Sequence, residues 1–274
     1  MNDAPDRIAP TVDFKAELAD MFNLAGKVVY MPGGYGGIGE ACAWALCMHG
    51  AKVVISGRNV EKAEELAANL RDGGFEAAGI GVDVTSVDEI RASVDKVVET
   101  FGGLDILLNC TGLQIEQPML EVTEEAFDQV YQVNLKASMF LGQAAAKHMI
   151  ETGRKGRIIH FLSVRSQLGI RNRGYSAYCS TKGGQVMMIK QHAMELAPHG
   201  INVNGVAPTF VYTEQIRHVM ENPEFRKYLY ERIPLGRIAD PKDIVGPVTF
   251  FCSPSASFVT GQTMYVDGGI TCSQ

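Results

Sequence analysis

Hydrophobic residues along the chain fall into short unbroken runs that alternate with longer stretches of helical periodicity. The short runs are rich in β-branched residues, which favour strands. Seven strands are predicted, at residues 28–31, 52–56, 77–82, 106–109, 157–162, 202–207 and 263–266.

The stretches between the strands carry apolar residues three and four positions apart, which is the spacing of an amphipathic helix. Helices are predicted at residues 37–49, 60–70, 87–101, 124–149 and 175–197. Strands alternating with helices are typical of βαβ units, and right-handed crossovers place helices on both faces of the sheet. The pattern predicts the α/β class, with a Rossmann-type, doubly wound sheet of seven parallel strands.

The domain organisation follows from length and pattern. A chain of 274 residues is long enough for one large domain, which we expect at residues 24–274. The polar arm at residues 1–23 is either a loose lead-in or a strap on a neighbouring subunit. Residues 208–241 lack a predicted strand, and their short helices suggest a mobile lid over a substrate.

Composition narrows the possible partners. The chain is 46% hydrophobic and 20% charged, as in ordinary soluble proteins, and its net charge of -6 lacks the basic surface that binds nucleic acid. It has neither an apolar leader nor an apolar stretch of about 18 residues, so no membrane partner is expected. The six cysteines show no C-x-x-C pair and no metal-ligand spacing, which fits a reducing cytosol. We predict a cytoplasmic protein that acts on a small molecule and holds no metal.

A glycine-rich loop follows the first predicted strand and leads into a helix. It reads Pro32-Gly33-Gly34-Tyr35-Gly36-Gly37-Ile38-Gly39. Such glycines let the backbone approach a pyrophosphate at the helix N-terminus, where free N–H groups and the helix dipole favour an anion. The alternative is a tight glycine turn that binds no ligand.

The end of the second strand bears on the choice of cofactor. An acidic residue about 20 positions after the loop would bind the ribose 2′-hydroxyl of NAD. Gly57 occupies that place here, and Arg58 follows it. A small residue beside an arginine leaves room and charge for a 2′-phosphate, so NADP is the preferred prediction. NAD stays open, because Arg58 also fits a solvated side chain at a helix start.

Tyr178 and Lys182 lie on a predicted helix, and a spacing of four places them on one face. A free tyrosine has a pKa of about 10, and a neighbouring ammonium group stabilises the phenolate. The pair is therefore suited to acid–base chemistry near neutral pH. Taken alone, the same spacing also fits a pair on the surface.

Together these motifs resemble the short-chain dehydrogenase/reductase family over residues 24–270. The glycine loop is similar to its T-G-x-x-x-G-I-G, and Tyr178 with Lys182 to its Y-x-x-x-K. Further matches, in family order, are Asp83-Val84 to the adenine-binding D-V, residues 109–112 to N-N-A-G, Asn134 to the helical Asn, Ser163 to the strand-end Ser, residues 208–213 to P-G-x-x-x-T and residues 265–269 to Y-V-D-G-G. The resemblance implies a nicotinamide-dependent oxidoreductase that interconverts a secondary alcohol and a ketone.

The resemblance also implies the site residues. The catalytic set would be Asn134, Ser163, Tyr178 and Lys182. Besides Tyr178 and Lys182, the cofactor set would be Gly33, Tyr35, Gly37, Ile38, Gly39, Gly57, Arg58, Asp83, Val84, Asn109, Thr111, Gly112, Pro208, Val211 and Thr213.

The roles implied by the family are specific. Tyr178 would donate a proton to the carbonyl oxygen of the substrate, and Ser163 would hold that oxygen. Lys182 would lower the pKa of Tyr178 and bind the nicotinamide ribose, while Asn134 would fix a water that relays protons to Lys182.

Several positions depart from the family pattern. Pro32 replaces the usual Thr of the loop, Cys110 and Thr111 replace Asn and Ala, and Thr209 replaces Gly. The interval between Ser163 and Tyr178 is about two residues longer than is common, a comparison that rests on the family resemblance. None of these changes removes a catalytic group, but the longer interval alters the rim of the substrate site.

Among the branches of the family, the segments after the fourth and fifth strands look most like gluconate 5-dehydrogenases and other sugar-acid dehydrogenases. Arg165 follows Ser163 at the carboxyl end of a strand, where ligands bind in open α/β sheets. We expect Arg165 to grip a carboxylate, and Gln114 to bind hydroxyl groups of a sugar acid or polyol. The alternative is that Arg165 points to solvent or to a neighbouring subunit. Residues 171–173 form a second polar cluster at the same rim.

Three rival functions share parts of this pattern. A 3-oxoacyl-thioester reductase carries the same motifs, and an isomerase or dehydratase would use the same Tyr and Lys. A cofactor-binding regulatory protein would have no need of the full catalytic set. The resemblance further implies a homotetramer packed through the helices at 124–149 and 175–197 and the last strand, and the apolar excess of these helices agrees with that.

Overall fold

Seven parallel strands form one sheet in the order β3-β2-β1-β4-β5-β6-β7, which confirms the predicted fold class. The computed structural model describes residues 14–272, apart from the side chains at positions 16, 17, 215, 218 and 219. The strands are β1 Val28–Pro32, β2 Lys52–Gly57, β3 Ala77–Gly81, β4 Ile106–Asn109, β5 Arg157–Phe161, β6 Asn202–Pro208 and β7 Thr263–Val266. Each predicted strand is present, with ends that differ by one residue at most.

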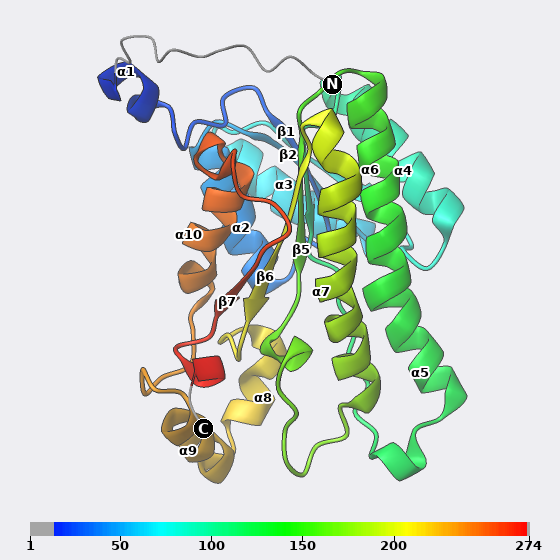
Figure 1. The fold of residues 1–274 in the computed structure, drawn as a ribbon, viewed down its shortest axis with the longest axis vertical. Coiled ribbons are helices and arrows are strands. Elements are labelled where there is room, and N and C mark those ends of the chain that lie inside the picture. The colour runs from blue at the N-terminus through cyan, green and yellow to red at the C-terminus, as the bar shows by residue number, and fades with distance from the viewer. Residues whose placement is uncertain (1–13, 273–274) are drawn as a thin grey trace.

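Helices cover both faces of the sheet, which runs through the middle of the molecule (Figure 1). One face carries α2 Gly37–Met48, α3 Val60–Asp72 and α10 Pro241–Cys252, and the other carries α4 Val87–Phe101, α6 Ala137–Glu151 and α7 Ser176–Leu196. Successive residues of β1 alternate between the two cores: Val29 and Met31 pack in the first, Val28 and Tyr30 in the second. Because side chains alternate along a strand, a strand that is apolar on both faces needs a helix layer on each side.

Capping residues in the sequence set where several helices begin. Asn59, Ser86 and Thr123 each accept a hydrogen bond from a backbone N–H in the first turn of the helix that follows. These bonds satisfy donors that have no partner inside the helix. Asp240 forms a capping box with Asp243 at the start of α10, just before the proline at the first helical position.

The helix predicted at residues 124–149 is interrupted. It consists of α5 Glu124–Tyr131, a π-helical turn at Gln132–Lys136, and α6. The apolar periodicity continues through the turn, so the sequence pattern carries no sign of the break. The π turn contains Asn134, whose side chain is buried and bonds outside the helix.

Residues 208–241 form short helices, as predicted. They comprise a turn at Glu214–Ile216, α8 Arg217–Met220 and α9 Pro223–Arg232. The base of the segment is closed by two backbone bonds, from Tyr212 to Ala239 and from Ala239 to Phe210. In Figure 1 α8 and α9 lie below the sheet, beyond the carboxyl end of β6. The mobility of this segment stays a prediction.

Shorter elements complete the described chain. The N-terminal arm contains α1 Phe14–Ala19, and the carbonyl of Met21 accepts bonds from the backbone and side chain of Ser255. The remainder of the predicted arm, residues 1–13, lies outside the described residues. Single 3-10 turns occur at Met119–Glu121, Val164–Ser166, Ala197–His199, Pro254–Ala256 and Ile270–Cys272. Within residues 14–272 no helix combines the length and the apolar character that a membrane crossing requires.

Candidate active site

The loops after β1 and β4 meet where the strand order reverses, which is the usual ligand crevice of an open α/β sheet. Gly33 has φ of +73°, a conformation that L side chains rarely adopt. A Cβ at Gly33 would approach the carbonyl oxygen of Cys110 to 3.0 Å. The glycine is therefore required both by the turn and by the close approach of the two loops.

The N-terminus of α2 offers an anion site. Its first turn follows Gly36, and no side chain caps it. The backbone N–H groups of that turn are therefore available to a ligand, and the helix dipole favours a negative one. A Cβ at Gly36 would meet nothing within 4 Å, whereas Gly37 lies directly against the side chain of Thr213. An uncapped helix start beside a glycine cradle fits the pyrophosphate of a dinucleotide.

The predicted cofactor-selecting positions lie at the end of β2. The ring of Tyr35 covers the position that a side chain at Gly57 would occupy, so an acidic residue would not fit there without moving Tyr35. Arg58 is exposed and forms no ion pair in the part of the chain that the structure describes. An uncommitted arginine beside a position without a carboxylate fits a 2′-phosphate better than a free ribose 2′-hydroxyl.

Other members of the predicted cofactor set shape their own loops. The side-chain oxygen of Asn109 accepts hydrogen bonds from the backbone and hydroxyl of Thr111, at 3.0 and 2.7 Å. Asp83 accepts two similar bonds from Thr85. Both side chains hold the carboxyl ends of their strands in the turn that faces the crevice, so part of their role is structural.

Ser163, Tyr178 and Lys182 are brought together beside the crevice. Ser163 follows β5, and the other two lie one turn apart on α7. The hydroxyl of Tyr178 is hydrogen-bonded to the side chain of Ser163. The ammonium of Lys182 donates to the carbonyl of Phe161 at 2.8 Å and lies 5.6 Å from the centre of the Tyr178 ring.

Burial shifts the two titrating groups in opposite directions. It raises the pKa of Tyr178 to about 12, against the hydrogen bond from Ser163 and the positive charge of Arg165, which lower it. It lowers the pKa of Lys182 to about 7. The family resemblance predicted that Lys182 would lower the pKa of Tyr178, whereas in this structure desolvation outweighs every charge near the phenol. Tyr178 is accordingly a protonated donor at neutral pH.

Asn134 is fully buried and its side chain is committed to the protein. Its amide oxygen accepts from the backbone N–H of Leu113 at 2.7 Å, and its amide nitrogen donates to the carbonyl of Leu113 and to the hydroxyl of Thr181. Its own carbonyl accepts from Gln185 and Ser138. Asn134 thus ties the loop after β4 to α7, a positioning role that the sequence did not predict. The water-fixing role stays a prediction.

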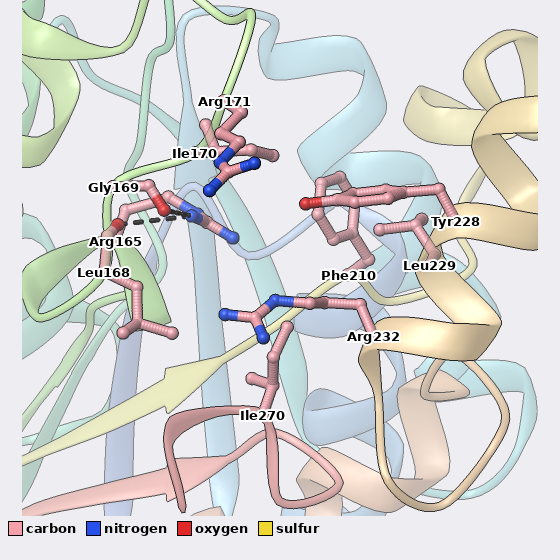
Figure 2. Close-up of a pocket in the computed structure, with 10 residues that line it drawn as sticks. All are labelled: Arg165, Leu168, Gly169, Ile170, Arg171, Phe210, Tyr228, Leu229, Arg232 and Ile270. Atoms are coloured by element: carbon pink, nitrogen blue, oxygen red, sulfur yellow. Dashed lines mark hydrogen bonds between the residues drawn. The ribbon is translucent and has the colours of Figure 1, made fainter. Parts of the chain in front are cut away.

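A cavity of about 650 Å³ opens beside the turn that follows Ser163 (Figure 2), and Ser163, Tyr178 and Lys182 are not among the residues that line it. Arg165 lines it and is only 7% exposed, so it does not point to solvent. One edge of its guanidinium donates to the carbonyls of Leu168 and Gly169, and the remainder faces the cavity. Gln114, by contrast, is exposed and does not line the cavity, so its contact with substrate stays a prediction. The lining residues are Arg165, Leu168, Gly169, Ile170, Arg171, Phe210, Tyr228, Leu229, Arg232 and Ile270.

Part of this lining was missed by sequence reasoning. Phe210, Tyr228 and Arg232 come from the predicted lid, but nothing in its sequence indicates which side chains turn inward. Of the polar cluster at the rim, Arg171 lines the cavity, whereas Arg173 turns away to pair with Glu116. The described residues contain no group of three or more His, Cys, Asp or Glu side chains placed to hold a metal ion.

Comparison with known proteins adds to this geometry. Residues 33–271 match the family model described as enoyl-(acyl carrier protein) reductase. The chain is 36% identical over 254 residues to gluconate 5-dehydrogenase of Gluconobacter oxydans (strain 621H), covering 93% of this chain and 98% of that protein. It is 34% identical to the 3-oxoacyl-[acyl-carrier-protein] reductase of Vibrio cholerae, covering 90% and 98%.

A solved structure agrees with the first of these relatives. A gluconate 5-dehydrogenase from Burkholderia cenocepacia J2315, crystallised in complex with NADP and tartrate, superposes with a TM-score of 0.89. It is 35% identical to this chain, and the match covers 94% of this chain and all of that one.

Proposed function

Because the chain belongs to the short-chain dehydrogenase/reductase family, we propose that it interconverts a secondary alcohol and a ketone on a sugar acid or polyol, with NADP as cofactor. The observation that carries the substrate class is the buried Arg165, which lines the cavity and whose backbone N–H donates to the hydroxyl of Ser163 at 3.2 Å. An arginine at that place binds a carboxylate in a fixed orientation. Membership of this family of oxidoreductases argues against the alternative function of a regulatory protein that only binds the cofactor.

Tyr178 is the acid–base group of the proposed reaction. In the direction of reduction, its phenolic proton passes to the carbonyl oxygen of the substrate, and Ser163 binds that oxygen as charge develops. Lys182 lies behind the phenol, where its ammonium stabilises the phenolate once the proton has left. A bound nicotinamide dinucleotide supplies or accepts the hydride. The residues from the chain therefore bind, orient and move the proton.

Two kinds of observation support NADP as the cofactor: the residues at the end of β2 and the ligand of a structural relative. Arg58 and the main chain at Gly57 would hold the 2′-phosphate, and the start of α2 would hold the pyrophosphate. The gluconate 5-dehydrogenase from Burkholderia cenocepacia, a structural relative, binds NADP. NAD is the alternative cofactor.

We further propose a cytoplasmic homotetramer. The outer surfaces of α5, α6 and α7 carry exposed apolar side chains that a second copy of this chain would cover. They are Phe127, Tyr131, Met139, Met187 and Met194.

Steady-state kinetics test this function. Purified protein is assayed for reduction of NADP⁺ and NAD⁺ with gluconate, related sugar acids, a neutral polyol and a 3-hydroxyacyl thioester. We expect turnover of a sugar acid with NADP⁺, and a loss of kcat of ~10²–10⁴-fold in Tyr178→Phe. Arg165→Ala should raise KM for acids and leave KM for the neutral polyol unchanged. Activity confined to thioesters would favour the 3-oxoacyl-thioester reductase instead.

A further inference from the structure

The cavity beside the catalytic cluster holds more positive charge than one carboxylate requires. Arg165, Arg171 and Arg232 all line it, and the described lining contains no acidic side chain. Figure 2 shows the three guanidinium groups turned toward the same space. Arg165 and Arg171 come from the connection between β5 and α7, and Arg232 comes from the last turn of α9. Their convergence is thus produced by the tertiary fold.

These arginines lack a counter-charge, as do Arg58, Arg157 and Arg226, whereas the other described arginines are paired. Arg154, Arg173 and Arg237 pair with carboxylates of Asp105, Glu116 and Asp243. None of the three cavity arginines forms an ion pair with a described residue. The chain has 31 acidic against 25 basic residues, so carboxylates are not scarce. Like charges repel more strongly in a partly desolvated space, and anions are what such a cluster binds.

We propose that the substrate carries two anionic groups, one bound by Arg165 and the second by Arg171 and Arg232. This inference rests on the proposed function and names its substrate class: a sugar acid whose far end carries a second carboxylate or a phosphate. Both groups are planar or tetrahedral oxyanions that guanidinium forks bind through paired hydrogen bonds.

The shape of the cavity agrees with a long polar substrate. Its volume of about 650 Å³ lies well within the range of small-molecule sites. Leu168, Ile170, Phe210, Leu229 and Ile270 form apolar walls between the charges. Arg165 is buried, Arg232 is half-buried and Arg171 is exposed, so the ionic contact of a substrate is strengthened most at Arg165.

The backbone beside Arg171 is adapted to its position. Asn172 has φ of 58°, the left-handed conformation that Asn tolerates better than most residues. The reversal at this residue separates its neighbours: Arg171 lines the cavity, and Arg173 leaves it to pair with Glu116. The left-handed residue Asn172 lies in the loop before α7 and allows Arg171 to face the cavity. By the family resemblance, this loop is about two residues longer than usual.

The test compares substrates that differ in charge at the far end. With NADP⁺ present, kcat/KM is measured for sorbitol, gluconate, glucarate and 6-phosphogluconate. We expect glucarate or 6-phosphogluconate to exceed gluconate by ~10-fold or more, and the better of these two identifies the second group as carboxylate or phosphate. Arg232→Gln and Arg171→Gln should each lower kcat/KM for that dianion ~10–100-fold, through KM, with less than about a threefold effect on gluconate. Arg217→Gln is the matched control, since Arg217 lies in the same segment, outside the cavity, paired with Glu214.

The outcomes separate this inference from the proposed function. Equal kcat/KM for gluconate and both dianions, with no change in that ratio in Arg232→Gln, would overturn the inference while the function stands. If no sugar acid is turned over, the proposed function fails, and calorimetric titration of glucarate and 6-phosphogluconate into the NADP-loaded enzyme decides the inference. Binding of a dianion that weakens in Arg232→Gln but not in Arg217→Gln would support it, and absence of binding would reject it.

Discussion

Lys182 and Tyr178 show how burial alone prepares a reactive pair. The Lys182 side chain is 2% exposed, and its ammonium donates to the carbonyl of Phe161. Few partners compensate for the lost hydration, so its pKa falls to about 7, while the pKa of Tyr178 rises to about 12. The Lys182 ammonium and the Tyr178 phenolate are disfavoured by burial in the free protein. Substrate and cofactor would supply hydrogen-bond and charge partners that stabilise these charged forms during the reaction.

Replacing Lys182 by methionine tests that shift through stability. Between the folded pKa of about 7 and the ordinary value of 10.5, the unfolded chain binds one proton more than the folded chain. Wild-type stability at this residue therefore rises with pH across that window, whereas a methionine side chain at the same position does not titrate. We expect Lys182→Met to be inactive but more stable near pH 7, with the advantage shrinking by roughly 3 kcal/mol toward pH 9.5.

Urea unfolding of the cofactor-free protein at several pH values measures that difference. Other titrating groups cancel, because both proteins contain them. Lys190→Met, on the exposed side of the same helix, is the matched control and should give a difference that does not depend on pH. A constant difference for Lys182→Met as well would show that Lys182 keeps an ordinary pKa.

The π turn at Gln132–Lys136 places one buried side chain, that of Asn134, where it can bond outside the helix. Asn134 bonds Leu113 with both its donor and its acceptor, and Thr181 with a second donor. An amide is required, because one partner is an N–H group and another is a carbonyl. The turn thereby connects the loop after β4 to the helix that bears Tyr178.

Asn134→Asp should therefore be strongly destabilising although it is nearly isosteric. A carboxylate can still accept from Leu113 N–H but would face the Leu113 carbonyl, in a position with no exposure to water. We expect a loss of roughly 3 kcal/mol in the free energy of unfolding. Thr181→Val removes the bond from Asn134 and the bond that the Thr181 hydroxyl donates to the Tyr178 carbonyl, and it should cost about 1–2 kcal/mol.

Denaturant unfolding measures both losses, and Asn69→Asp on the exposed side of α3 is the control, with an expected change below about 0.5 kcal/mol. If Asn134→Asp were as stable as the control, the three bonds would contribute little to the fold.

At the scale of the whole molecule, exposed apolar residues are unevenly placed. Met187 and Met194 are seven positions apart on α7 and are 62% and 73% exposed. Residues at that spacing share a helix face, and α6 lies alongside α7 in Figure 1 with Met139 also exposed. Such a surface is costly in an isolated subunit, and association of copies would remove it from water.

Met187→Glu should accordingly lower the mass of the assembled protein, because a buried carboxylate without a partner opposes association. Light scattering after size exclusion measures the mass for both proteins at equal concentration. Met48→Glu is a matched control, since Met48 is 69% exposed on α2, on the other side of the sheet. A monomeric wild type, or equal masses for all three proteins, would contradict the proposed assembly.

The alternation of strands and helices and the order of the motifs could be predicted from the order of the amino acids alone. Strand ends were predictable to one residue, because buried β-branched runs are local signals. The glycine loop and the pair Tyr178 and Lys182 were found from residue types at short, fixed spacings, whereas Ser163 was found through the family resemblance.

Tertiary structure alone decided what depends on residues distant in sequence. The π turn and the contact of Asn134 with Leu113 are features of the tertiary structure that the sequence pattern does not indicate. The raised pKa of Tyr178 likewise depends on its burial in the folded protein. The approach of Arg232 to Arg165 and Arg171 likewise has no sequence spacing to reveal it, because Arg232 comes from a distant segment. Periodicity reports which face of an element is buried, whereas the direction of a single side chain is fixed by the neighbours that the fold brings to it.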